Sequence, residues 1–238
     1  QAAHPGDSGL SILDYFLKDS PTIPEDMGVF LGTTYRMHSR VNEFISQHIY
    51  EGKLLSAPTT DKRIIRVPKT YSGPLDIEAG IRFIPVVHQG NTQASPEEIE
   101  VIQSLVSELL GRTLVTDRPD EPIRSITWDD ILFVAPFNHQ VGKLKTALGD
   151  QAKVGSVDKF QGQEAPIVIL SMASSDATES ARGVEFLLDK NRLNVAISRA
   201  QTLAIVVGHP HLGHAQATRI EQLRLLSLYN AITDYTAL

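Results

Sequence analysis

The chain has 238 residues, 42% hydrophobic and 21% charged, which is typical of a soluble globular protein with one large domain, or with one domain and a small appendage. It has no cysteine, which excludes disulfides and cysteine-ligated metal sites and fits a reducing cytoplasm, and no apolar run reaches the roughly 18 residues of a membrane span. The formal net charge of −6 argues against a simple DNA-binding module, because a domain that holds nucleic acid by bulk charge is basic.

The first part of the chain predicts few regular elements. Residues 1–28 are expected to form a lead-in segment with a short amphipathic helix at 9–17, followed by a short strand at 29–31. A helix is expected from His38 to Tyr50, with its apolar residues on one face. Residues 56–80, rich in proline, glycine and charge, predict a long loop or a small insertion.

From residue 81 onward, strands and helices alternate. Ser95 to Glu98 supplies an N-cap, a proline at the first helical position and a capping-box glutamate for a helix that Gly111 ends. Strands are expected at 81–87, 131–135, 154–157, 167–172 and 203–207, and further helices at 140–148, 191–200 and 216–230. Continuous apolar runs mark buried parallel strands, so this order predicts an α/β domain with a mostly parallel sheet.

Three segments near strand ends carry the candidate chemistry: Thr34–His38, Gly155–Glu164 and Asn191–Ala200. Ligands of open parallel sheets bind at one edge of the sheet. If 191–200 is one helix, Arg192 and Arg199 share a face about 10 Å apart, which suits a phosphate chain held across an interface. The plainer interpretation pairs each arginine with a surface carboxylate, and makes 161–164 a polar turn in which Gly162 serves backbone shape.

Together the three segments resemble the second motor domain of superfamily 1 helicases. The match is closest to the branch with the nonsense-mediated-decay RNA helicase and the flap-trimming nuclease-helicases. Those proteins read Y-R-M-H, V-D-x-F-Q-G-x-E and R-R-L-N-V-A-L-T-R-A, from which this chain departs at Asn191, Ile197 and Ser198. A fourth segment, Phe133–Gln140, is similar to V-A-P-Y-x-x-Q, with Phe137 replacing the tyrosine.

The resemblance implies a domain organisation. A RecA-like, three-layer α/β fold is expected for 29–238, with 56–80 as a candidate insertion, and 1–28 would connect it to a preceding motor domain. Residues 1–5 and 9–11 also resemble the run after the first motor domain in bacterial proteins that fuse a RecB-like nuclease to this helicase type.

The resemblance also implies roles for single residues. Arg36 and Arg199 would reach the γ-phosphate of ATP as arginine fingers, which place positive charge where negative charge develops. Gln161, Gly162, Glu164 and Arg192 would serve ATP binding, with Glu164 on the ribose hydroxyls and Arg192 bracing the interface. Three residues fall where the family holds the nucleic-acid backbone: Asn138, Gln140 and Ser156. Short polar groups contact phosphates without reading sequence, so an acidic domain can still hold a strand.

The sequence contains no G-x-x-x-x-G-K-[ST] motif and no acidic metal-binding motif after a strand. ATP and Mg²⁺ would therefore be held mainly by a separate first motor domain, and this chain alone is expected not to hydrolyse ATP. Single-stranded nucleic acid, DNA before RNA, is the other expected partner, with no membrane association.

Several other features are weaker. His209, His211 and His214 lack a nearby acidic partner, so no metal site is predicted. The basic run Lys62, Arg63, Arg66 and Lys69 is interpreted as a solvated face, with a strand-facing surface as the alternative. Two competing functions stay open: a degenerate RecA-like binding scaffold and a complete small nucleotide hydrolase.

Overall fold

The computed structural model describes residues 31–160, 162–176, 190–214 and 220–235. Its centre is a five-stranded parallel sheet in the order β4-β10-β9-β7-β8. The strands are β4 (Gly80–Pro85), β7 (Ile131–Val134), β8 (Lys153–Gly155), β9 (Ala165–Ser171) and β10 (Ala200–Gly208). The expected α/β, RecA-like fold with a mostly parallel sheet is confirmed.

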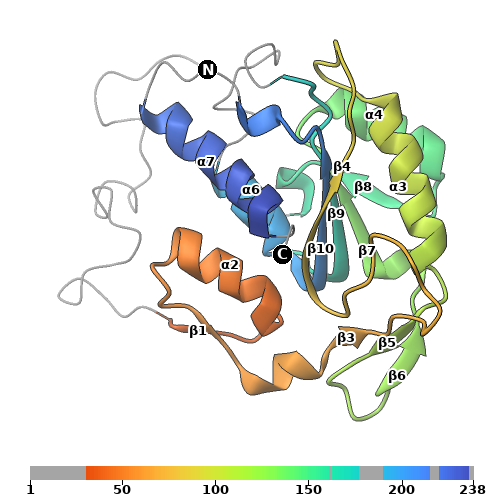
Figure 1. Ribbon diagram of the computed structural model, residues 1–238. Coiled ribbons are helices and arrows are strands. Elements are labelled where there is room, and N and C mark those ends of the chain that lie inside the picture. The colour runs from red at the N-terminus through yellow and green to blue at the C-terminus, as the bar shows by residue number, and fades with distance from the viewer. Residues whose placement is uncertain (1–30, 161, 177–189, 215–219, 236–238) are drawn as a thin grey trace.

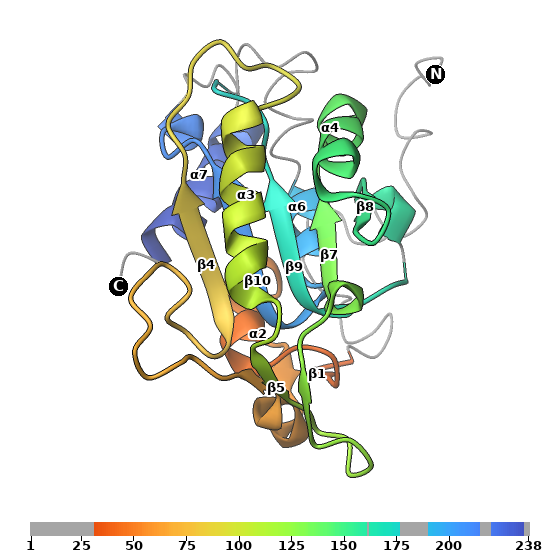
Figure 2. The same ribbon diagram turned by 90° about the vertical axis from the view of Figure 1, so that its right-hand side faces the viewer.

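Helices cover both faces of the sheet (Figures 1 and 2). One face carries α3 and α4, and the other carries α2, α6 and α7. The helices are α2 (Ser39–Ile49), α3 (Pro96–Leu109), α4 (Asn138–Leu148), α6 (Lys190–Ile197) and α7 (Ile220–Tyr235). The helix expected at 9–17 and most of the strand expected at 29–31 lie outside the described residues.

Alternate strand residues enter two separate cores. In β9, Ile167 and Ile169 pack toward α3 and α4, whereas Val168 and Leu170 pack toward the α2, α6 and α7 layer. Because successive side chains point to opposite faces, a strand buried on both faces must be apolar throughout. The apolar runs therefore follow from the three-layer arrangement.

Two small sheets lie beyond the main one. The parallel pair joins β1 (Thr33–Thr34) to β2 (Leu55–Ser56). The antiparallel sheet has the order β3-β5-β6, formed by β3 (Ile64–Ile65), β5 (Thr113–Val115) and β6 (Ile123–Ser125). We call the edge of the main sheet at which its strands begin the amino edge, and the opposite edge the carboxyl edge. Figure 2 shows both small sheets below the amino edge.

Candidate functional site

Arg36 and Glu164 meet at the amino edge of the sheet. Arg36 lies between β1 and α2, and Glu164 immediately precedes β9. The Arg36 Nε donates to Glu164 Oε2 at 2.5 Å, and Gln201 Nε2, near the start of β10, donates to Oε1 at 2.8 Å. The two charged side chains keep 35% and 41% of their surface exposed. The carboxylate is therefore oriented by the protein and still open to a ligand.

The electrostatics of Glu164 favour its ionised form. Partial burial raises the pKa of this carboxyl, but the hydrogen bonds from Arg36 and Gln201 and the charge of Arg36 outweigh it and hold the pKa below its ordinary value. At neutral pH the site therefore presents an anionic acceptor between two donors.

Arg199 lies in the turn between α6 and β10, beside this pair. Its backbone N–H donates to Ala196 O at 3.2 Å, and its carbonyl accepts from Ala165 N at 3.1 Å, which ties the turn to β9. Burial and then the positive charge of Arg36 lower the pKa of Arg199, while Glu164 opposes them. Within the described part of the chain, the buried Nε of Arg199 has no hydrogen-bond partner.

The Arg199 guanidinium therefore lies within electrostatic range of both Arg36 and Glu164. A buried polar group without a partner is uncommon in folded proteins, and like charges close together favour an anion between them. The structure brings Arg36 and Glu164 into contact although they are 128 residues apart in the sequence, and Arg199 lies near both. This arrangement can accept an anionic ligand.

The expected placement of Arg192 and Arg199 on one helix is wrong. Helix α6 ends at Ile197, so Arg199 lies beyond the helix. Arg192 instead lines a small cavity together with Ser156, Pro136 and Met172. Helical periodicity does not mark where a helix ends, and here a turn through Ser198 and Arg199 intervenes before β10.

The nucleic-acid candidates lie at the opposite, carboxyl edge. Ser156 follows β8 and is half-buried, and Asn138 is the exposed first residue of α4, after β7. The candidate residues therefore divide between two edges of the sheet instead of gathering at one. Gln161 lies outside the described residues. Gly162 has φ +79°, a left-handed conformation that favours glycine, so backbone shape alone requires it.

Gln140 is fully buried, which does not suit a direct contact with nucleic acid. Its Oε1 accepts from Ser95 N at 2.9 Å, and its Nε2 donates to Ser171 Oγ at 2.8 Å and to Ser95 O at 3.3 Å. The side chain therefore joins α4 to the start of α3 and the end of β9.

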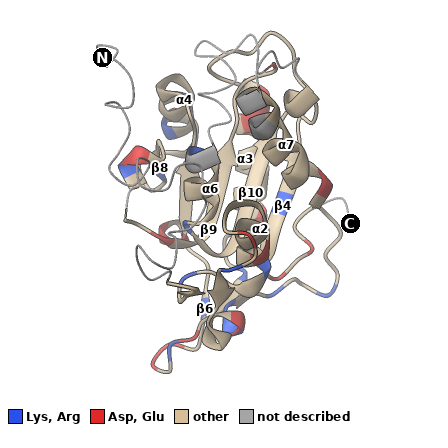
Figure 3. Ribbon diagram, turned by 90° about the vertical axis from the view of Figure 1, so that its left-hand side faces the viewer, with Lys and Arg blue, Asp and Glu red and all other residues tan. Residues whose placement is uncertain are grey.

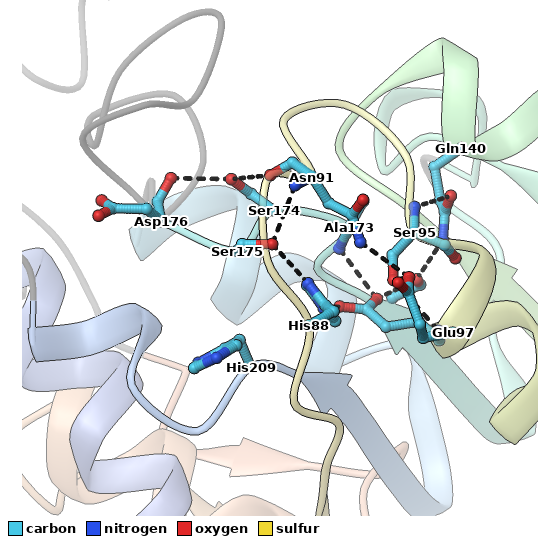
Figure 4. A network of polar contacts seen from close by, with 12 residues as sticks. His88, Asn91, Ser95, Glu97, Gln140, Ala173, Ser174, Ser175, Asp176 and His209 are labelled. Carbon is cyan, nitrogen blue, oxygen red and sulfur yellow. Dashed lines mark hydrogen bonds and ion pairs between the residues drawn. The ribbon is translucent and has the colours of Figure 1, made fainter.

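Gln140 belongs to a buried polar network at the carboxyl edge, which sequence reasoning missed (Figure 4). At its centre Glu98, fully buried, accepts from Ser171 Oγ at 2.5 Å and from Ala173 N at 2.9 Å. His88 Nε2 lies 3.0 Å from Glu98 Oε1, and His88 Nδ1 lies 2.7 Å from Ser175 Oγ. With its proton on Nε2, the ring donates to Glu98 and accepts from the serine.

The capping-box prediction is half right. Ser95 Oγ accepts from Glu98 N at 3.2 Å, as an N-cap should. The Glu98 carboxylate does not return to Ser95 N, because Gln140 already accepts that N–H. Glu98 instead binds Ala173, a non-glycine residue at φ +66°, and so helps to stabilise an uncommon backbone conformation.

Charged residues of both signs surround the amino edge and the β5–β6 hairpin, whereas the strands of the sheet are almost free of charge (Figure 3). Among the described residues, no group of three or more histidine and acidic side chains is arranged to hold a metal ion. In the same part of the chain, no helix has both the length and the apolar character that crossing a membrane requires.

Residues 10–211 match the AAA domain family. The chain belongs to this family. It is 32% identical to the DNA polymerase alpha-associated DNA helicase A of Saccharomyces cerevisiae over 210 residues, 84% of this chain and 30% of that protein. It is 30% identical to the ATP-dependent helicase upf1 of Schizosaccharomyces pombe, over 74% of this chain and 19% of the relative.

A third relative, helicase SEN1 of Saccharomyces cerevisiae, is 29% identical over 75% of this chain and 8% of its own length. The chain therefore spans less than a third of the length of these relatives. All three are named as helicases, so this AAA domain is a helicase-related domain.

Proposed function

We propose that this chain is the C-terminal motor domain of a superfamily 1 helicase or translocase, and that its amino edge is half of the ATP site. The observation that carries the proposal is Arg199, whose buried Nε has no hydrogen-bond partner among the described residues and whose guanidinium lies in the field of Arg36. A phosphate group would satisfy both guanidiniums, which suits arginine fingers in phosphoryl transfer.

The neighbouring groups fit the rest of a nucleotide. The half-exposed Glu164 carboxylate can accept hydrogen bonds from ribose hydroxyls in the cleft that it lines together with Arg36. Tyr35, 73% exposed, presents an aromatic ring next to Arg36, on which a planar base can stack. ATP would bring the phosphoanhydride bond that is hydrolysed, and Mg²⁺ and the β-phosphate would be held by a first motor domain, because this sequence has no phosphate-binding loop.

The carboxyl edge supplies the proposed nucleic-acid track. Exposed Asn138 starts α4, where backbone N–H groups point outward and attract phosphates. Ser156 and Arg192 line one cavity beyond β8, so we add Arg192 to the track and leave the buried Gln140 out of it. Single-stranded DNA is the first candidate strand.

The test is ATP hydrolysis by the complete protein that contains this chain, with and without single-stranded DNA. Arg199→Ala should bind ATP but lose about 10³–10⁵-fold in rate, the usual contribution of an arginine finger. Arg118→Ala is the matched control, because that arginine is 65% exposed and pairs with Asp120 at 2.9 Å.

Equal rates of ATP hydrolysis for the wild type and Arg199→Ala, or no hydrolysis by the complete protein, would contradict the motor function. The domain would then be interpreted as a RecA-like binding scaffold. The chain on its own should not turn over ATP, and measurable hydrolysis by it would contradict the division of the site between two domains.

A further inference from the structure

Arg63 holds the backbone on which Arg36 is carried. It follows the 3₁₀ turn Pro58–Lys62 and precedes β3. Its Nη1 donates to the carbonyl oxygen of Arg36, and its Nη2 donates to that of Tyr35 at 3.2 Å. The planar guanidinium has donors in a fixed fork, so it can hold two consecutive carbonyls at once. This arginine therefore does not belong to a solvated basic face.

The surrounding segment, residues 56–63, reinforces the same contact. It binds the backbone on both sides of Arg36 through hydrogen bonds of 2.8 Å each: Ala57 N to Thr34 O, Ser56 Oγ to Met37 O, and Ser39 N to Asp61 Oδ1. Together with Arg63, this segment binds every carbonyl from residue 34 to residue 37. The direction in which Arg36 leaves the backbone is thus set by residues 56–63.

Asp117, in the loop after β5, holds Arg63 from the other side. Its Oδ2 accepts from Arg63 Nη2 at 2.8 Å, and the two side chains are 24% and 15% exposed. The hydrogen bond from Arg63 holds the pKa of this carboxyl below its ordinary value, which burial opposes. The pair lines a cavity of about 790 Å³ that also reaches Glu164 and Gln201.

We propose that Arg63 is a positioning residue that aims the guanidinium of Arg36, and that Asp117 fixes Arg63 in the required orientation. The inference rests on the proposed function, in which Arg36 acts on a phosphate. A reacting group displaced by about 1 Å can cost about 100-fold in rate even when the change lies outside the chemistry. Loss of Arg63 frees two carbonyls next to Arg36, so its effect should appear in the rate of hydrolysis.

The experiment compares variants of the complete protein in steady-state ATP hydrolysis. Arg63→Ala should lower kcat about 100-fold, with a much smaller change in KM for ATP. Arg66→Ala is the matched control, because this arginine lies three residues further along the chain and its side chain is exposed. Arg63→Lys should recover only part of the rate, because an ammonium group cannot reproduce the fork.

A double-variant comparison separates positioning from a general structural role. If Arg63 acts through Arg36, adding Arg63→Ala to Arg36→Ala should cause no further loss of rate. A further loss of about 100-fold in that background, full recovery by Arg63→Lys, or an Arg63→Ala rate equal to that of Arg66→Ala would each overturn the positioning role. If Arg63→Ala does not fold, Asp117→Asn gives the same comparison with the guanidinium retained, and it should lower kcat with a much smaller change in KM for ATP.

The outcome for Arg36→Ala alone distinguishes the two proposals. If Arg36→Ala hydrolyses ATP slowly and Arg63→Ala hydrolyses it at the wild-type rate, the proposed function stands and only the positioning role is overturned. An Arg36→Ala variant that hydrolyses ATP like the wild type overturns the proposed function, and the positioning role with it.

Discussion

Each edge of the central sheet carries a carboxylate beside a basic side chain, and the two pairs differ in their access to solvent. At the carboxyl edge, the Glu98 and His88 side chains are 0% exposed and 3.0 Å apart. At the amino edge, Glu164 and Arg36 are 41% and 35% exposed and 2.5 Å apart. Of these two pairs, one therefore lies inside the protein and the other at its surface.

The two pairs also differ in how fully the polar groups around them are hydrogen-bonded. Glu98 is satisfied by a serine hydroxyl, a backbone N–H and a histidine, and with Gln140 it ties α3 and α4 to the end of β9. Beside Glu164, by contrast, Arg199 keeps a buried Nε without a partner among the described residues. A fully satisfied buried network rigidifies a fold, whereas an unsatisfied charged group beside an open pair suits a ligand.

The largest expected effect is a difference in stability between alanine variants of the two carboxylates, Glu98 and Glu164. Glu98→Ala should lower the free energy of unfolding by about 3–5 kcal/mol, because it leaves buried partners uncompensated. Glu164→Ala should cost at most about 1 kcal/mol, since solvent screens an exposed pair. Urea unfolding of both variants measures this difference. Equal losses in the free energy of unfolding would contradict a structural role for Glu98 that Glu164 does not share.

A smaller effect concerns the cap of α2, next to Arg36. His38 Nδ1 accepts from Arg40 N at 3.1 Å and so acts as the N-cap. Burial lowers the pKa of His38 below its ordinary 6.5, with Asp61 opposing. As the pH falls, the imidazole of His38 is therefore protonated in the unfolded chain before it is protonated in the folded one. The contribution of His38 to the free energy of unfolding is complete above pH 6.5 and is lost as the pH falls through the folded pKa. His38→Ala should cost about 1 kcal/mol at neutral pH.

His38→Asn is the informative variant for this cap, because asparagine keeps an accepting oxygen and does not titrate. Between pH 7 and 5 (roughly the range in which histidine titrates) the wild type should lose stability relative to His38→Asn. Parallel pH profiles for the two proteins would show that His38 does not contribute through its neutral ring.

The sequence predicted the elements whose signals are local. The apolar runs gave β7, β9 and β10, and the proline and serine before Glu98 gave the start of α3. The β5–β6 hairpin was missed because each strand has three residues, too few for an alternating pattern to stand out.

The sequence also predicted Arg36, Glu164 and Arg199 as candidate site residues from their motifs, and the structure places the three near one another. Arg63 was missed because its acceptors near Arg36 are backbone carbonyls 27 and 28 residues away, which leave no trace in residue types. The role of Glu98 was mistaken for a local one, because its partners Ser171 and Ala173 are 73 and 75 residues away. Whether a carboxylate such as that of Glu98 caps its own helix or binds residues far away in the sequence depends on the tertiary structure.

The most direct test of the amino edge as half of an ATP site is a structure of the complete protein with a non-hydrolysable ATP analogue. The guanidiniums of Arg36 and Arg199 should then lie within about 3 Å of oxygens of the γ-phosphate. Glu164 should face the ribose. A bound nucleotide that leaves this edge exposed to solvent, or that binds at the carboxyl edge, would contradict the account.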